Sequence, residues 1–299
     1  MAPTTRMTTD PAMGAGSAEA VRPSEVLRRA TDYLDRHGVE SPRSSAEILL
    51  VEVLGTDRAG LFSRTEGLSS AEARAYGRAL CQRCAGTPLQ HLTGHQPFRG
   101  IDLAVRPGVF VPRPETEVLV EAALALVVRV DSPAVVDVGT GTGAVALAVA
   151  RERLDARVWA TDLSPEAVKL ATENAERLLL PVRALEGNLF GPLPGELRGR
   201  VDLVVANPPY LDAADAADLP PEVRADPDLA LYGGTEIHRR IARESRGWLV
   251  PGGGAAVEMG ATQGPDVRTI FERAGYEAVE VHPDLALRDR VVTARLPGP

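Results

Sequence analysis

Hydrophobic positions along the chain follow two different patterns. Between residues 24 and 86 they recur three and four apart, as in Leu27, Ala30 and Leu34, which predicts short amphipathic helices. From residue 134 onward, short apolar runs alternate with stretches of helical periodicity. Strands that alternate with helices predict a mostly parallel sheet covered on both faces. The chain is therefore expected to combine a small helical module with an α/β domain.

The α/β part can be divided into individual elements. Its predicted strands are 134–138, 158–161, 182–186, 201–206, 255–258, 278–281 and 291–296. Its predicted helices are one that follows Pro114, then 143–153, 165–179 with Ser164 as its N-cap, a helix near 236–249, and 266–274. Because the last two strands follow each other closely, we expect the seven-stranded sheet to end in an antiparallel pair.

Changes in composition suggest the domain boundaries. Residues 1–22 are rich in Thr, Ala, Gly, Met and Pro without periodicity, which predicts a disordered tail. Residues 23–86 form the predicted N-terminal helical-bundle domain. Residues 87–114 are dense in Gly and Pro and predict a connector that carries a hairpin. Residues 115–299 form the predicted α/β domain.

Charge and composition exclude several classes of protein. The chain has 33 Lys and Arg against 41 Asp and Glu, a net charge of −8, which disfavours binding to nucleic acid through phosphate contacts. No run of 18 apolar residues predicts a membrane span, and the N-terminus lacks the apolar core of a signal peptide. Two cysteines, Cys81 and Cys84, cannot form a disulfide framework, so we expect a cytoplasmic protein. We expect no metal site.

A glycine-rich loop follows the first predicted strand. It runs through Asp137, Gly139, Thr140, Gly141, Thr142 and Gly143. Glycines let the backbone turn sharply and let a ligand touch the main chain. In open parallel sheets, ligands bind beyond the carboxyl ends of the strands. Asp162 ends the next strand, where its carboxylate can accept both hydroxyl hydrogens of a ribose. A nucleoside-bearing cofactor is therefore expected.

The loop alone leaves the cofactor open. Gly139, Gly141 and Ala144 also satisfy the dinucleotide fingerprint, so an NAD-dependent oxidoreductase is an alternative. No His or Tyr–Lys pair lies near the strand ends to relay a proton. S-adenosylmethionine is favoured because it has no pyrophosphate and carries an ammonium group, which Asp137 can help to hold. A protein that binds this cofactor only to fold is a third alternative.

The segment Asn207-Pro208-Pro209-Tyr210 follows the fourth predicted strand, at the same rim as the glycine loop. Its prolines fix φ and remove two donors, so the turn offers the Asn207 side-chain oxygen and the Pro208 carbonyl as acceptors. Tyr210 adds a flat face for stacking. Two acceptors can direct a planar NH₂ group at a sulfonium methyl and stabilise the positive charge that develops on nitrogen. Asn207, Pro208 and Tyr210 are therefore the candidate catalytic residues.

Two further strings extend this pattern: residues 88–94, Pro-Leu-Gln-His-Leu-Thr-Gly, and residues 110–117, Phe-Val-Pro-Arg-Pro-Glu-Thr-Glu. With them, residues 24–296 resemble the protein-(glutamine-N5) methyltransferases. The resemblance implies a Rossmann-like class I S-adenosylmethionine-dependent methyltransferase fold. It also implies methyl transfer to a glutamine in the Gly-Gly-Gln loop of a peptide chain release factor. We expect a monomer that contacts neither nucleic acid nor membrane.

The resemblance also implies roles for individual positions. The glycine loop, Asp162, Asn188, Leu189 and Asn207 would contact the cofactor; Asn207, Pro208, Pro209 and Tyr210 would hold the glutamine amide; Pro112, Arg113 and Glu115 would wall the substrate pocket. Arg113 and Glu115 alternatively form a structural ion pair. The N-terminal helical module would bind the protein substrate.

The sequence departs from the family pattern in three places. Asn188 stands where the family usually has an acid, Asp226 replaces Glu before Pro227, and residues 235–237 read Thr-Glu-Ile in place of Asp-Gly-Leu. The last two changes fall in the loop expected to cover the substrate, so another protein or a small-molecule amide is an alternative acceptor. An adenine-N6 methyltransferase acting on nucleic acid is a further alternative, but it would need a basic groove around an extruded base.

Overall fold

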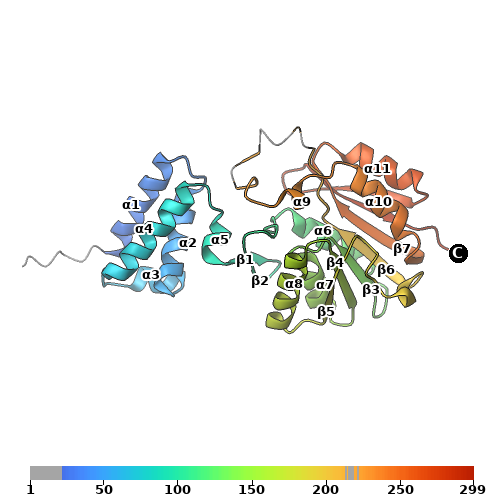
Figure 1. Cartoon of the computed structure of the whole chain (residues 1–299), viewed down its shortest axis with the longest axis horizontal. Helices are drawn as coiled ribbons and strands as arrows, with labels where there is room; N and C mark the ends of the chain where they lie inside the picture. Colours follow the sequence, from blue (N-terminus) through green and yellow to red (C-terminus); the bar gives the residue numbers. More distant parts are fainter. Residues whose placement is uncertain (1–21, 213, 215–218, 221) are drawn as a thin grey trace, which may run out of the picture. The chain divides into compact units, whose positions relative to one another are not determined.

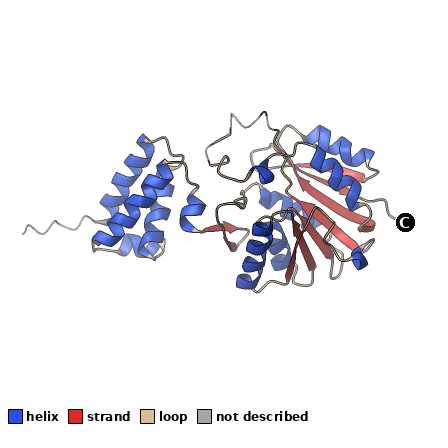
Figure 2. Cartoon of the chain, viewed as in Figure 1, coloured by secondary structure: helices blue, strands red, loops and turns tan. Residues whose placement is uncertain are grey.

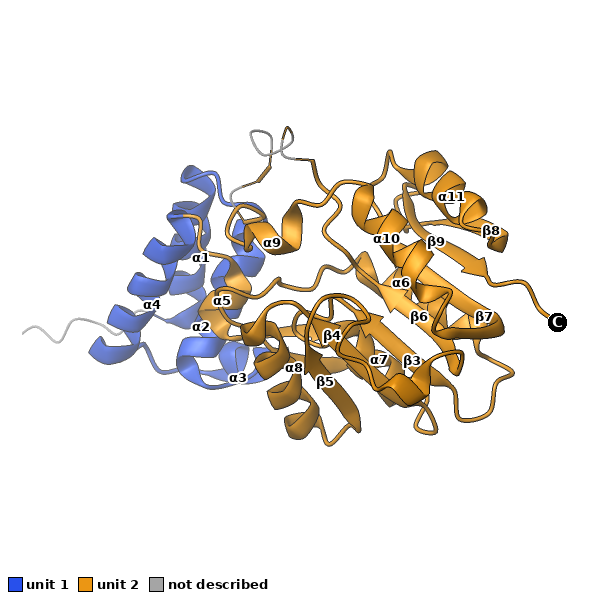
Figure 3. Ribbon diagram, turned by 45° about the vertical axis from the view of Figure 1, so that its right-hand side comes forward, with its two compact units in different colours: residues 1–85 blue, residues 86–299 orange. Residues whose placement is uncertain are grey.

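The computed structural model describes residues 22–212, 214, 219–220 and 222–299 (Figure 1). The predicted disordered tail therefore lies outside the described residues, apart from Arg22. The chain divides into two compact units, Met1–Ala85 and Gly86–Pro299 (Figure 3). Within the part of the chain that the structure describes, no helix is long and apolar enough to cross a membrane.

The first unit is a bundle of short helices, as the periodicity predicts. Its helices are α1 (Pro23–Arg36), α2 (Pro42–Leu54), α3 (Arg58–Ser63) and α4 (Ser70–Cys84). Its core contains Leu27, Leu34 and Leu50, which are all fully buried. A capping box begins α4: Ser69 Oγ accepts from the Glu72 N–H, and the Glu72 carboxylate accepts from the Ser69 N–H.

The second unit is built on a seven-stranded sheet in the order β5-β4-β3-β6-β7-β9-β8. The strands are β3 (Ala134–Val138), β4 (Arg157–Asp162), β5 (Val182–Glu186), β6 (Val201–Ala206), β7 (Leu249–Glu258), β8 (Glu277–Pro283) and β9 (Asp289–Arg295). The five strands from β5 to β7 are parallel. Strand β9 pairs antiparallel with both β7 and β8. The predicted sheet with its antiparallel end is therefore confirmed.

Helices cover both faces of this sheet (Figure 2). They are α6 (Thr116–Leu126), α7 (Ala144–Glu152), α8 (Pro165–Leu178), α10 (Glu236–Ser245) and α11 (Gly264–Arg273). The short helix α9 (Asp228–Leu231) lies in the connection between β6 and α10, and a 3₁₀ turn at Gly195–Leu197 lies between β5 and β6. Successive residues of a strand point to opposite faces. Val135 therefore packs in one core with α6 and α7, while Val136 packs in the other with α10 and α11.

A short helix and a hairpin precede this sheet. They are α5 (Leu89–Thr93), β1 (His95–Phe98) and β2 (Ile101–Ala104). Arg99 and Gly100 both have positive φ, 40° and 72°, as a two-residue hairpin turn requires. Phe98, Ile101 and Leu103 are buried in the core beneath α6 and α7. The hairpin is thus a packed part of the second unit.

One pair of predicted boundaries is wrong. The helix predicted to extend to residue 249 ends at Ser245, and the strand predicted from residue 255 begins at Leu249. Leu249 pairs with Val201 of β6 despite the Pro-Gly-Gly-Gly that follows it. Trp248 is buried and stacks on Phe190, with ring centroids 6.1 Å apart, and this packing ends the helix. Tertiary contacts here override the local signals.

Candidate active site

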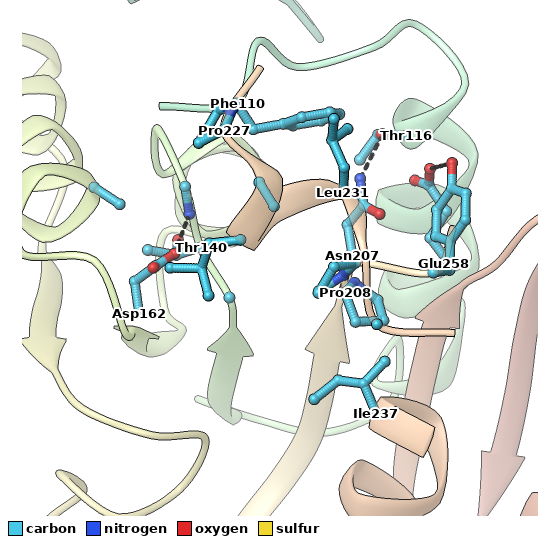
Figure 4. A pocket seen from close by; sticks show the side chains of 18 of the residues that line it. Phe110, Thr116, Thr140, Asp162, Asn207, Pro208, Pro227, Leu231, Ile237 and Glu258 are labelled. Carbon is cyan, nitrogen blue, oxygen red and sulfur yellow. Dashed lines mark hydrogen bonds between the residues drawn. The ribbon is translucent and has the colours of Figure 1, made fainter. Parts of the chain in front are cut away.

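A cavity of about 920 Å³ opens at the carboxyl ends of the parallel strands (Figure 4). The first strand of the sheet, β3, lies between β4 and β6, so the chain reverses its direction of winding between β3 and β6. Open α/β sheets bind their ligands at this switch point. The register pairs Val138 with Ala206, which brings the glycine loop and the Asn-Pro-Pro-Tyr turn to the same rim, as predicted.

The glycine loop turns from β3 into α7 with positive φ at Gly139, Gly141 and Gly143. Its predicted residues line the cavity, with the exception of Gly143. A methyl group at Gly143 would lie 3.0 Å from Leu147 Cδ1 and 3.3 Å from the Ala171 Cβ. Gly143 is therefore required for close packing between α7 and α8, and it stands behind the ligand-facing surface of the loop.

Two carboxylates flank the loop. Asp162 Oδ2 accepts a hydrogen bond from the Gly141 N–H at 2.8 Å, and its Oδ1 accepts one from the Ser164 N–H at 2.9 Å. Asp137 Oδ2 accepts from the Thr140 hydroxyl at 2.6 Å and from the Ala146 N–H at 3.1 Å. Burial raises the pKa of both acids, and that of Asp137 to about 7. A cation next to Asp137 would favour its charged form.

The segment after β5 forms another part of the wall. Asn188 and Leu189 line the cavity, and Leu189 has a φ of 49°. Asn188 Oδ1 accepts a hydrogen bond from the Arg240 guanidinium at 3.1 Å. The Arg240 guanidinium therefore uses one of the two lone pairs of this oxygen, and the second lone pair and the amide NH₂ remain for a ligand.

Asn207 is held in one orientation. Its Nδ2 donates a hydrogen bond to Thr116 Oγ1 at 3.1 Å, which leaves Oδ1 as the acceptor offered to a ligand (Figure 4). Thr116 begins α6 and is only 2% exposed. Pro208, Pro209 and Tyr210 line the cavity beside Asn207. The Asn-Pro-Pro-Tyr turn therefore lines the cavity, and Thr116 binds the amide nitrogen of Asn207. The Pro208 carbonyl as a second acceptor stays a prediction.

Contacts with other segments support the Asn-Pro-Pro-Tyr turn. The Tyr210 hydroxyl donates to Glu258 Oε1 at 3.4 Å, and the Tyr210 carbonyl accepts from Gln263 Nε2 at 2.8 Å. Leu211 pairs with Tyr232, and the Leu211 carbonyl accepts from the Gly233 N–H at 3.1 Å. Burial raises the pKa of Tyr210, so the phenol remains a donor at neutral pH.

Sequence reasoning missed several residues of this cavity. Glu258, the last residue of β7, is 2% exposed, and burial raises its pKa to about 7. Phe110 and Leu231 form an apolar side of the pocket near Asn207 (Figure 4). Phe110 lies within the family string at 110–117, which could have marked it, whereas an acid that ends an apolar strand carries no distinct sequence signal.

The predicted residues Pro112, Arg113 and Glu115 line the cavity, but Arg113 and Glu115 do not pair with each other. Arg113 forms an ion pair with Asp226, which also accepts from the Val111 N–H at 3.1 Å. Glu115 lies 3.6 Å from Arg288. The alternative of an Arg113–Glu115 pair is therefore wrong. Asp226 is one of the three departures from the family pattern. Its ion pair with Arg113 connects the segment before α9 to the cavity-lining segment that contains Arg113.

Comparisons with known proteins agree with this geometry. The family model described as the PrmC N-terminal domain matches residues 25–94, and the Methyltransferase small domain matches residues 101–219. Release factor glutamine methyltransferase of Deinococcus radiodurans is 45% identical over 279 residues, 92% of this chain and 98% of that protein. The Moorella thermoacetica protein of the same name is 42% identical, over 90% of this chain and 97% of its own length.

A solved structure extends the comparison to the fold. The 16S rRNA N2 G1207 methyltransferase of T. thermophilus, in complex with AdoMet and guanosine, aligns with a TM-score of 0.51 and 21% identity. The alignment covers 68% of this chain and 49% of that one. It shows that the two chains share the methyltransferase fold. By its sequence over nearly the whole length and by its fold, the chain belongs to the release factor glutamine methyltransferase family.

Proposed function

We propose that this protein transfers a methyl group from S-adenosylmethionine to the side-chain amide nitrogen of a glutamine in a peptide chain release factor. The observation that carries the proposal is the orientation of Asn207. Its Nδ2 is bound to Thr116, which leaves Oδ1 as an acceptor, and the neighbouring Pro208 carbonyl would be the second acceptor. A carboxamide NH₂ has two donors that match such a pair.

The residues of the cavity fit the cofactor. Asp162 stands at the end of β4 with both oxygens at the rim, where ribose hydroxyls would add hydrogen bonds to its remaining lone pairs. Asp137 offers a negative charge near the glycine loop for the cofactor's ammonium group. Asn188 and Leu189 would border the adenine ring. The cavity volume, about 920 Å³, is sufficient for a cofactor together with one substrate side chain.

The reaction needs positioning more than acid–base chemistry. Bound S-adenosylmethionine supplies a methyl carbon on a positively charged sulfur, which is already a good leaving group. Asn207 Oδ1 and the Pro208 carbonyl would hold the glutamine nitrogen in line with the carbon–sulfur bond. The glutamine nitrogen would supply the electron pair of the new bond to carbon, with the neutral thioether as the leaving group. The same two oxygens stabilise the positive charge on nitrogen, which then loses one proton to water.

The apolar side of the pocket suits the neutral stem of glutamine. Phe110 and Leu231 lie near Asn207, and Ile237, which replaces the usual Leu, lines the same cavity (Figure 4). The Ile237 replacement keeps the position apolar. This departure therefore preserves an apolar wall for the stem of the same acceptor side chain.

The test is methyl transfer from labelled S-adenosylmethionine to purified release factor. A release factor with Gln→Ala in its Gly-Gly-Gln loop serves as the matched control. We expect label in the first protein and none in the second, with the modified glutamine located by mass spectrometry. Label on nucleic acid, or equal label on both release factors, would contradict the proposal.

We further propose that the protein acts as a cytoplasmic monomer whose N-terminal helical unit binds the release factor. The described residues that line the cavity all belong to Gly86–Pro299, so one chain supplies this set without a second copy. Cys81 and Cys84 are free thiols, which suits a reducing compartment. Light scattering in solution would report the mass of a single chain.

A further inference from the structure

Glu258 is a buried acid that the proposed methyl transfer does not use. It ends β7, and because β7 and β6 are parallel with Val257 paired to Ala206, it reaches the rim beside Asn207. Its side chain lines the cavity yet is almost completely buried. Burying a carboxylate is costly unless it is paired or hydrogen-bonded, so the partners of Glu258 at this strand end need to be identified.

Two hydroxyls next to Glu258 connect it to the acceptor turn. The Tyr210 hydroxyl donates to its Oε1 at 3.4 Å. The Thr116 hydroxyl lowers the pKa of Glu258, against the larger effect of burial, because it stabilises the charged form. Thr116 Oγ1 itself accepts from Asn207 Nδ2. Figure 4 shows Thr116, Asn207 and Glu258 next to one another at the rim.

Several other groups face Glu258. Arg290 of β9, 9% exposed, is electrostatically coupled to it and pairs with Asp284 at 3.1 Å. Glu115, which precedes α6, is a second negative charge near Glu258 and raises the pKa of Glu258. His238 of α10 bonds the Glu258 backbone carbonyl through Nε2 at 2.9 Å. Within the described residues, Glu258 Oε2 has no hydrogen-bond partner. The charged carboxylate therefore retains capacity to accept the hydroxyl protons around it.

We propose that Glu258 is a positioning residue for methyl transfer. Its carboxylate receives the hydroxyl protons of Thr116 and Tyr210. Since the Thr116 proton is then committed to Glu258, only the lone pairs of Oγ1 face Asn207, so Asn207 must present Nδ2 to Thr116 and Oδ1 to the substrate. The inference deepens the proposed function and depends on it.

The consequence is a dependence of turnover on the ionisation of Glu258. The carboxylate form accepts both hydroxyls, whereas the protonated form becomes a donor and releases one of them. Because its pKa is raised to about 7, kcat should rise with pH through about 7 in the wild type. In Glu258→Gln this rise of kcat with pH should be absent, since the amide does not titrate.

The experiment measures kcat, KM for release factor and cofactor affinity for Glu258→Gln, with Glu280→Gln on the exposed face of β8 as the matched control. We expect kcat to fall about 10²-fold with both affinities unchanged, and no change in the control. Thr116→Val should lower kcat in the same way, and the double variant should be no slower than the slower single variant.

The outcomes separate this inference from the proposed function. A wild-type protein that does not methylate release factor refutes the function itself. An active wild type together with an unchanged kcat in Glu258→Gln overturns the positioning role. The positioning role is also overturned if Glu258→Gln has a lower kcat but keeps the wild-type pH dependence. It is overturned as well if the reductions in kcat caused by Glu258→Gln and Thr116→Val multiply in the double variant. Thr116→Val and the wild-type pH profile decide the matter even if Glu258→Gln does not fold.

Discussion

At the scale of single residues, the amide of Asn207 has the most specific task. Its nitrogen is bound to Thr116, so its oxygen is the part that a substrate NH₂ can use. Asn207→Ala should therefore lower kcat by about 10²-fold or more, while cofactor affinity changes much less. Calorimetry with S-adenosylmethionine and a methyl-transfer assay provide the two measurements. An unchanged kcat would remove Asn207 from the chemistry.

A second prediction at this scale concerns the ionisation of Asp137. Burial raises its pKa to about 7, so below that pH the carboxyl is largely protonated in the free protein. The cofactor's ammonium group would favour the charged form, so binding should release a proton. S-adenosylmethionine affinity should then rise between about pH 6 and about pH 8, with the rise ending above the free-protein pKa of Asp137.

Calorimetry in two buffers of different ionisation enthalpy measures that proton release directly. Asp137→Asn should bind S-adenosylmethionine with an affinity that no longer depends on pH over this range. The same proton release from the variant would show that another group titrates, and the ammonium would then be held elsewhere.

At the scale of elements, the turn before α10 supports the Asn-Pro-Pro-Tyr turn. A methyl group at Gly233 would lie 2.3 Å from the Pro209 carbonyl oxygen, so backbone would have to move. Gly233→Ala should displace that turn and lower kcat about 10-fold. Gly77→Ala in α4 is the matched control, because nothing lies within 4 Å of a methyl group there and alanine favours helix. Equal activity of the two variants would show that the turn adapts.

The same scale shows what the sequence could predict. The short buried strand β3, the glycine loop and the proline-containing turn are local signals, and their common rim follows from the alternation of strands and helices. The partner of Asn207 is 91 residues away in the sequence, and only the packing of α6 brings Thr116 to it. Glu258 likewise needs the β6–β7 register. The candidate acceptors were thus predictable, and the network that orients them was not.

At the scale of the whole molecule, the proposed binding of release factor by the first unit requires a suitable surface on that unit. It has a hollow of about 300 Å³ lined by residues of α1 and α3. Phe62 borders this hollow and is 53% exposed, with the Arg58 guanidinium 5.8 Å from its ring centroid. An exposed aromatic next to a hollow and an arginine has the composition of a binding hot spot.

Phe62→Asp should therefore raise KM for intact release factor about 5-fold, equivalent to about 1 kcal/mol, and leave kcat unchanged. A short peptide that contains Gly-Gly-Gln reaches only the cavity of the second unit, so its KM should be the same for variant and wild type. Leu154→Asp is the control, because Leu154 is 79% exposed and lies in the second unit. If Phe62→Asp changes KM equally for the peptide and for intact release factor, the first unit acts on the folding of the enzyme and not on its choice of substrate.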